Sequence, residues 1–263
     1  MDSMGTGTGA SRPIAVGVRA SLDQLEKAWT TLAEADPLWA VCVSRDRRGG
    51  RWDLAEFMAS GRAEIDLAVD RLGQLGICSG QNAALDFGCG VGRLTAALAG
   101  HFGSVTGVDL AEPMLAQARS LHADTDRCTF VRNDAPDLSV FPDATFDLVY
   151  CSLVLQHLPP GLAAGYLREF VRVSRPGGAI VIVVPEAHQL TPSGLVYSLA
   201  PQRLIGFLQR RAFGYPAGMQ MRVLPVRRIR RIVEPAGAAI VGSYPAASVG
   251  PHWRGSCHFI ARI

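Results

Sequence analysis

Residues 84–100, ALDFGCGVGRLTAALAG, place three glycines within five positions, between a short apolar run and a predicted helix. At such a junction a bare backbone permits a tight turn and lets a ligand approach without Cβ atoms in the way. In an open α/β sheet, the loop after the first strand lies at the carboxyl edge, where ligands bind. The chain is therefore predicted to form an α/β sheet with a ligand site beside residues 88–92.

Short apolar runs alternate with amphipathic segments beyond this loop. The runs predicted as strands are 83–87, 104–110, 128–134, 145–151 and 179–184. The segments predicted as helices between them are 91–100, 112–120 and 161–174. Strands that alternate with helices of this length predict a parallel, doubly wound sheet with right-handed crossovers. A further helix and two strands are predicted after residue 225.

The rest of the chain is predicted to flank this α/β domain, which covers 81–263. Residues 1–20 are expected to be a flexible tail, and 21–80 a helical cap with Ser21 as a plausible N-cap. The alternation stops over about 186–225, where apolar, aromatic and basic residues mix with Pro and Gly, as in an inserted lid.

Composition narrows the class of protein. Apolar residues make up 48% and charged residues 19%, which favours a folded core. The net charge of +3 is too small to indicate a polyanionic partner. The six cysteines show neither disulfide nor metal-site spacing. The longest apolar run is too short to span a membrane, and the N-terminus lacks a secretory pattern. A soluble, cytoplasmic protein without a metal, membrane or nucleic-acid partner is expected.

The glycine spacing argues against the two commonest phosphate-binding loops. The dinucleotide fingerprint is G-x-G-x-x-G, but here Arg93 holds the third place and the glycine comes one residue early, at Gly92. Asp86, two residues before the first glycine, would repel a pyrophosphate and attract an ammonium group. No Gly-Lys-Ser/Thr sequence is present, which excludes a P-loop.

Five motifs in order resemble the class I S-adenosylmethionine-dependent methyltransferases, and more narrowly their bacterial branch that acts on small molecules. They are LDFGCGVGRLT, VTGVDLAEPMLAQA, NDAPDL, FDLVYCSLVLQHL and RPGG, within residues 83–185. The resemblance implies a Rossmann-like, seven-stranded, mostly parallel sheet with the last strand antiparallel. It implies S-adenosyl-L-methionine as cofactor, with S-adenosyl-L-homocysteine as product, and a small-molecule methyl acceptor.

The same resemblance assigns cofactor contacts to residues of this chain. Asp109 would accept hydrogen bonds from the ribose hydroxyls, and Asp134 with the backbone of Ala135 would bind the adenine. The other residues expected at the cofactor are Leu110 and Met114 around the adenine, and Asp86, Gly88, Gly90, Gly92, Arg93, Cys151 and Ser152 around the methionine portion. Each has a structural alternative: Asp109 can cap a helix, Asp134 can be a turn residue, Arg93 can pair with Asp86, and Leu110 and Met114 can be core.

Methyl transfer needs alignment and exclusion of water, and it needs a base only if the acceptor arrives protonated. His157 and His188 follow the fourth and fifth predicted strands and are the candidate bases. Aromatic residues in the cap and lid indicate a hydrophobic or aromatic acceptor. The eight arginines between 203 and 231 suggest an acidic ligand, but the alternation in VRRIRRIV favours a solvated helix face.

Three other functions stay open from the sequence. One is an RNA or protein methyltransferase, although the Asn/Asp-Pro-Pro-aromatic tetrapeptide of DNA amino-methylating enzymes is missing after the fourth strand. The second is an NAD-dependent oxidoreductase, disfavoured by Gly92, Arg93 and Asp86. The third is a binding protein that holds the cofactor without turnover. The acceptor, the methylated atom and the oligomeric state are not determined by the sequence.

Overall fold

The computed structural model of the protein describes residues 16–44, 46–77, 80–191, 194, 198–246, 249–250 and 252–263. The described strands are β1 (Ala83–Phe87), β2 (Ser104–Asp109), β3 (Cys128–Arg132), β4 (Phe146–Ser152), β5 (Ser174–His188), β6 (Ala238–Ala246) and β7 (Trp253–Arg262). The described helices are α1 (Val16–Ala35), α2 (Pro37–Val41), α3 (Leu54–Leu75), α4 (Arg93–Leu98), α5 (Glu112–Leu121), the 3₁₀ turn η1 (Leu155–His157), α6 (Pro160–Val173), α8 (Gln202–Arg211) and α9 (Val226–Val233).

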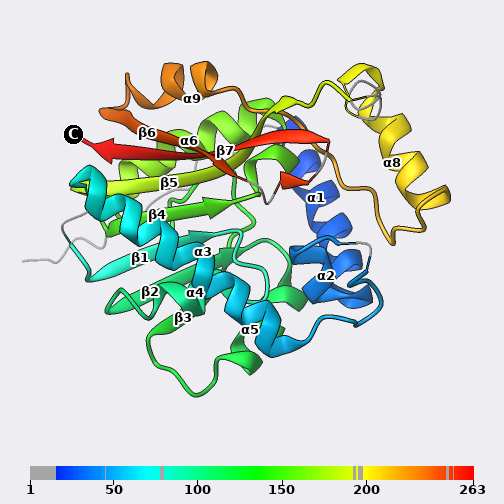
Figure 1. The fold of residues 1–263 in the computed structure, drawn as a ribbon, viewed down its shortest axis with the longest axis horizontal. Coiled ribbons are helices and arrows are strands. Elements are labelled where there is room, and N and C mark those ends of the chain that lie inside the picture. The colour runs from blue at the N-terminus through cyan, green and yellow to red at the C-terminus, as the bar shows by residue number, and fades with distance from the viewer. Residues whose placement is uncertain are drawn as a thin grey trace, which may run out of the picture.

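The strands form one seven-stranded sheet in the order β3-β2-β1-β4-β5-β7-β6 (Figure 1). The first five strands along the chain are parallel to one another, whereas β7 runs antiparallel between β5 and β6. The Rossmann-like sheet with an antiparallel last strand is therefore confirmed. The order reverses between β1 and β4, which places the switch point directly beside the glycine loop.

Each face of the sheet is covered by its own helices. On one face α3 and α4 contribute Ile65, Leu72 and Leu98 to a buried cluster. On the other face α6 and α9 contribute residues such as Phe170 and Ile229 to the largest cluster. Because both faces are covered, the central strands consist mostly of buried apolar residues, as in other parallel sheets.

The N-terminal cap differs in detail from the prediction. Helix α1 begins at Val16, so 16–20 belong to a helix, and only 1–15 of the expected tail lie outside the described residues. Ser21 is not an N-cap: its Oγ donates to the Gly17 carbonyl inside α1. Helix α3 begins after Asp53, whose carboxylate accepts the Glu56 N–H and thus caps the first turn.

The elements around the lid also depart from the expected limits. Strand β5 begins at Ser174 and includes RPGG, which was predicted as a turn before the strand. From Ala179 to His188 the strand pairs with β7, and this neighbour supports residues beyond the apolar run. In the lid region, α8 is the described helix that precedes α9. Among the described residues, no helix combines the length and apolar character needed to cross a membrane.

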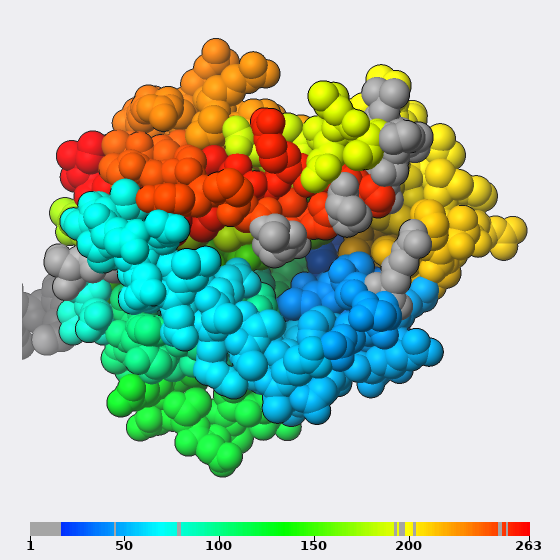
Figure 2. Space-filling model, viewed as in Figure 1, coloured from blue at the N-terminus to red at the C-terminus, as the bar shows by residue number. Residues whose placement is uncertain are grey.

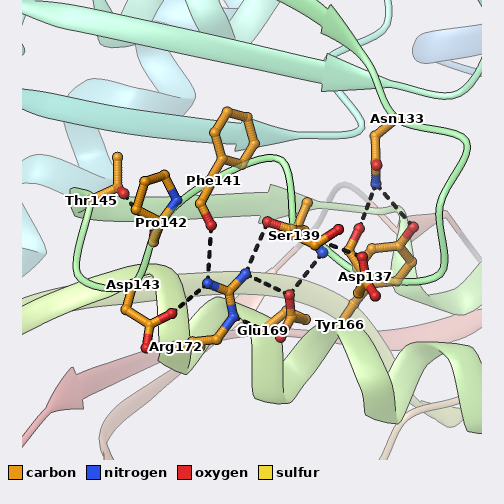
Figure 3. Close-up of polar contacts among 11 residues, drawn as sticks. Asn133, Asp137, Ser139, Phe141, Pro142, Asp143, Thr145, Tyr166, Glu169 and Arg172 are labelled. Atoms are coloured by element: carbon orange, nitrogen blue, oxygen red, sulfur yellow. Dashed lines mark hydrogen bonds and ion pairs between the residues drawn. The ribbon is translucent and has the colours of Figure 1, made fainter. Parts of the chain in front are cut away.

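Arg172, in the last turn of α6, holds the loop between β3 and β4 against the helix (Figure 3). Its guanidinium donates to the carbonyl oxygens of Leu138 and Phe141 at 2.9 and 3.0 Å. It also pairs with Glu169 and Asp143, both at 2.7 Å. The Glu169 carboxylate in turn accepts the Leu138 N–H. The loop that follows β3 is thus fixed by side chains of α6.

We expect Arg172→Met to lower the free energy of unfolding by about 2–3 kcal/mol, because it leaves two loop carbonyls without their side-chain donor and removes the cation paired with Glu169. Urea denaturation of the purified protein measures this change. The matched control is Arg168→Met, an exposed position on the same helix, which should change stability by no more than about 0.5 kcal/mol. Equal effects of the two substitutions would contradict the assigned role of Arg172.

Candidate functional site

The glycine loop turns sharply after β1 and folds back toward β2. The N–H groups of Gly88 and Cys89 both donate to the Val108 carbonyl, at 2.7 and 3.0 Å. Gly88 and Gly90 have φ angles of 78° and 53°, which side chains rarely adopt. A Cβ at Gly88 would also collide with Val154, and one at Gly90 would lie 2.6 Å from a methyl group of Val41. Glycine is therefore required at both positions, as predicted for a closely approached loop.

Asp109 lies at the carboxyl end of β2, directly beside this loop. One carboxylate oxygen accepts the Gly90 N–H and the other accepts the Ala111 N–H, both at 2.9 Å. Helix α5 has no side-chain N-cap, so Asp109 does not play the structural role of helix cap. Burial raises its pKa, although the backbone hydrogen bonds oppose the rise. The carboxylate is held in one orientation and retains free lone pairs on both oxygens.

The residues expected around an adenine lie on the loop after β3 and on α5. The Ala135 carbonyl accepts a hydrogen bond from the Tyr166 hydroxyl at 2.6 Å, so α6 also fixes this part of the loop. The Asp134 side chain is half exposed and lies 3.5 Å from Arg132. Leu110 is partly buried against the core, whereas Met114 is 1% exposed within a cluster under α2. Met114 is thus a residue of the hydrophobic core.

Asp86 points away from the loop and into the contact with α4. It is 1% exposed, and its carboxylate accepts the Thr95 hydroxyl at 2.7 Å. Burial raises the pKa of Asp86 to about 7, the carboxylates of Glu64 and Asp109 add to the rise, and Thr95 and Arg93 oppose it. The structure does not expose this carboxylate to a ligand, in contrast to the predicted contact with an ammonium group.

Arg93 pairs with a residue that sequence analysis did not identify. Its guanidinium lies 2.8 Å from Glu64 of α3. Glu64 also accepts hydrogen bonds from the Ser152 and Tyr150 hydroxyls, at 2.7 and 3.2 Å. Its side chain is 22% exposed. Glu64 follows Gly61 by three residues and precedes Ala68 by four, so helical spacing along the buried face of α3 was the signal that could have found it.

Cys151 and Ser152, the two β4 residues expected near the methionine portion, differ in burial. Ser152 reaches Glu64 and lies at the carboxyl edge of the sheet. Cys151 is completely buried in the core cluster, and burial raises the pKa of its thiol far above the ordinary value. A buried, protonated thiol of this kind is a poor nucleophile.

A cavity of about 200 Å³ lies between α1, the residues around η1 and residues 218–222 at the end of the lid. Its lining includes Trp29 and Leu32 of α1, His157 of η1, and Met219 and Arg222 of the lid. Other described aromatic residues of the lid do not line it: Phe207 and Phe213 are 51% and 47% exposed, and Tyr197 lies outside the described residues. The part of the lid that lines the cavity is therefore its end, residues 218–222, and these phenylalanines do not line it.

The two candidate bases occupy different environments. His157 Nδ1 lies 2.6 Å from the Gln220 carbonyl and its Nε2 lies 3.3 Å from Gln156 Nε2. Burial lowers the pKa of His157 to about 4, the Arg222 charge lowers it further, and backbone carbonyls oppose the shift. His157 is thus neutral at neutral pH and lines the cavity. His188 pairs across the sheet with Trp253 and does not line this cavity.

We expect Asp86 to make stability depend on pH. Its pKa of about 7 in the folded protein exceeds the ordinary value of 3.8, so the stability that is present below pH 4 is lost as the pH rises through 7. The loss approaches about 1.4 kcal/mol per pH unit within that window. Asp86→Asn keeps the acceptor for Thr95 and removes the titration. Thermal unfolding from pH 4 to 8 should therefore give a flatter curve for the variant, and parallel curves would contradict the assignment.

Comparison with known proteins adds a family assignment to this geometry. Residues 84–178 match the family described as "Methyltransferase domain". Demethylmenaquinone methyltransferase of Staphylococcus aureus strain MRSA252 is 35% identical over 128 residues, which are 48% of this chain and 52% of that protein. The same enzyme of strain JH9 is 36% identical over 119 residues, 44% of this chain and 48% of that protein. The chain thus matches about half the length of these relatives.

Two solved structures share the fold over nearly the whole chain. Magnesium protoporphyrin IX methyltransferase from Synechocystis PCC 6803 with bound S-adenosylhomocysteine superposes with a TM-score of 0.61, at 18% identity, over 92% of this chain and 100% of that chain. The 1,6-didemethyltoxoflavin-N1-methyltransferase of Burkholderia thailandensis gives a TM-score of 0.61 at 19% identity, over 96% of this chain and 93% of that chain. Residues 84–178 thus match a methyltransferase domain, and the whole chain has the Rossmann-like fold of these solved methyltransferases.

Proposed function

We propose that this chain transfers a methyl group from S-adenosylmethionine to a small hydrophobic or aromatic acceptor, onto oxygen or nitrogen. The observation that carries the proposal is the carboxylate of Asp109, oriented by two backbone N–H groups at the end of β2 and adjacent to Gly90. A carboxylate held in this way suits a ribose diol, because hydrogen bonds to a charged acceptor are the stronger kind.

The charges around the loop fit this cofactor better than a dinucleotide. Asp109 and Glu64 bring two acidic side chains to the loop, Asp86 lies buried behind them, and the nearby Arg93 is already paired with Glu64. Such a site disfavours a pyrophosphate, whereas it can accept hydroxyl and ammonium groups. The methionine portion would lie along Gly88 and Gly90, near Ser152 and Glu64. The adenine would be held by Asp134 and the N–H of Ala135, with Leu110 at its side.

The cofactor, when bound, supplies a methyl group already activated by its sulfonium, so the protein mainly aligns the acceptor and excludes water. The cavity beside Trp29 and His157 supports this role, because its walls come from α1, η1 and the lid. With a pKa of about 4, His157 is unprotonated at neutral pH and could accept a proton from a hydroxyl substrate, but burial makes it a weak base. His188, which does not line the cavity, is the weaker proposal for a base.

The size of the cavity limits the acceptor. Ligand pockets commonly measure about 300–1,000 Å³, and this one is about 200 Å³. It suits one or two aromatic rings better than a whole porphyrin. The named substrates of the relatives provide a graded set of probes: 1,6-didemethyltoxoflavin, reduced demethylmenaquinone and magnesium protoporphyrin IX. Methylation of an RNA or a protein is the alternative, and turnover with small acceptors in the absence of macromolecules decides against it.

Asp109→Ala should weaken binding of S-adenosylhomocysteine at least tenfold, because two charge-assisted hydrogen bonds are each worth about 1.5–3 kcal/mol. Isothermal titration calorimetry measures the affinity. The control is Asp126→Ala, an exposed position outside the site, which should bind like the unaltered chain. NADH should give no heat with either protein. Unchanged affinity in Asp109→Ala would refute the ribose contact.

Trp29→Ala should raise the KM for the acceptor severalfold and leave the affinity for S-adenosylhomocysteine within about twofold, because Trp29 lines the cavity, packs edge-on against His157 and makes no hydrogen bond to Asp109 among the described interactions. Release of S-adenosylhomocysteine with the best of the three probes gives KM and kcat. A loss of cofactor affinity with an unchanged KM would place the acceptor elsewhere.

A further inference from the structure

Helix α8 carries apolar residues on its outward face and a buried polar residue on its inward face. Leu204, Phe207 and Leu208 are 48%, 51% and 38% exposed. Ile205 and Gln209, on the opposite face, are 4% and 5% exposed. This arrangement is the reverse of an ordinary surface helix, whose apolar face is turned toward the core.

Contacts of the inward face fix α8 in this orientation. Gln209 accepts the Met219 N–H on its side chain at 2.8 Å and the Tyr215 N–H on its carbonyl at 2.9 Å. Gly206 and Gly218 approach so closely that a Cβ at Gly218 would lie 3.0 Å from the Gly206 Cα. Because rolling α8 would break the Gln209 hydrogen bonds in a buried environment, the helix cannot turn its leucines inward without cost.

Exposed apolar residues also lie directly before and after the helix. Leu199 precedes α8 and is 76% exposed, and Phe213 follows it and is 47% exposed. Figures 1 and 2 show this segment, in yellow, at one end of the molecule and projecting from the body that surrounds the sheet. Contiguous exposed leucine and phenylalanine side chains mark an interaction surface and are uncommon on a free soluble surface.

The charge around this surface is of one sign. Residues 187–233 contain eight arginines and no aspartate or glutamate. Of these, Arg210 and Arg211 are exposed on the last turn of α8. Arg48 adds a further positive charge, since its guanidinium donates to the carbonyls of Phe213 and Gly214. A partner that complements this surface has hydrocarbon chains next to negatively charged groups.

We propose that α8, together with Leu199 and Phe213, docks in the interfacial layer of a membrane that contains anionic lipids. Leu204, Phe207 and Leu208 would enter the acyl boundary, while Arg210 and Arg211 contact the headgroups, as in other interfacial amphipathic helices. A second copy of the chain is a poorer occupant, because a two-fold interface would bring the same arginines face to face. The helix lies on the bilayer and does not cross it.

This docking is independent of the proposed methyl transfer, but it bears on that activity. The segment from Gly218 to Arg222, which follows α8, lines the cavity assigned to the acceptor. The anchored helix would therefore hold the cavity near the bilayer. An acceptor that partitions into lipid could then enter without crossing bulk water.

Sedimentation with large vesicles tests the docking directly on the full chain. We expect binding to vesicles of equal parts phosphatidylglycerol and phosphatidylcholine, at least tenfold weaker binding to phosphatidylcholine alone, and a decline with added salt. Absence of binding, or equal binding to both vesicles, would overturn the proposal. So would self-association in solution that depends on Phe207, because it would assign the face to a second copy.

Two pairs of variants connect the binding to α8. Phe207→Ser with Leu208→Ser should weaken vesicle binding at least tenfold, whereas Leu67→Ser, at a 59% exposed position on α3, should not. Arg210→Gln with Arg211→Gln should weaken binding to the anionic vesicles at least tenfold, whereas Arg227→Gln with Arg228→Gln on α9 should have less than a twofold effect. All positions are exposed, and unchanged melting temperatures verify that the variants fold. Equal effects of the α8 and control variants would contradict the assignment.

Discussion

The site depends on the backbone turn after β1, where two consecutive N–H groups donate to the Val108 carbonyl of the neighbouring strand. This turn requires left-handed φ angles that glycine adopts most readily, and it carries the Gly90 N–H to the carboxylate of Asp109. The loop and the acidic residue at the end of β2 therefore form one unit. Because β1 and β2 are held in register by the sheet, the geometry of this unit is set by the fold and not by the ligand.

A second connection links the helical cap to the sheet. Glu64 of α3 joins Arg93 at the start of α4 to the Ser152 and Tyr150 hydroxyls of β4. Asp86 lies buried beside this group, with a pKa near neutrality. The acidic environment suits a cofactor with an ammonium group and a diol, and it disfavours a phosphate.

The lid has two faces with different roles. Its end, residues 218–222, places Met219 and Arg222 at the cavity, and the Gln220 carbonyl fixes the orientation of His157. Its helix α8 turns leucine and phenylalanine side chains outward. The two roles are coupled because Gln209 of α8 holds the Met219 N–H, so the helix that presents the apolar surface also positions the cavity wall. The proposed acceptor cavity and the proposed docking surface thus share one segment of the chain.

The sequence by itself determined the α/β sheet, the glycine loop and the position of Asp109, because short buried strands and obligatory glycines leave local signals along the chain. It did not determine the length of β5, since the residues beyond its apolar run depend on pairing with β7. It could not assign Arg93 to Glu64, 29 residues away, or show that Asp86 faces α4. The tertiary structure also decided that Phe207 and Phe213 point away from the cavity. Helical periodicity shows that a segment has an apolar face, but only packing determines which side of the segment meets the protein.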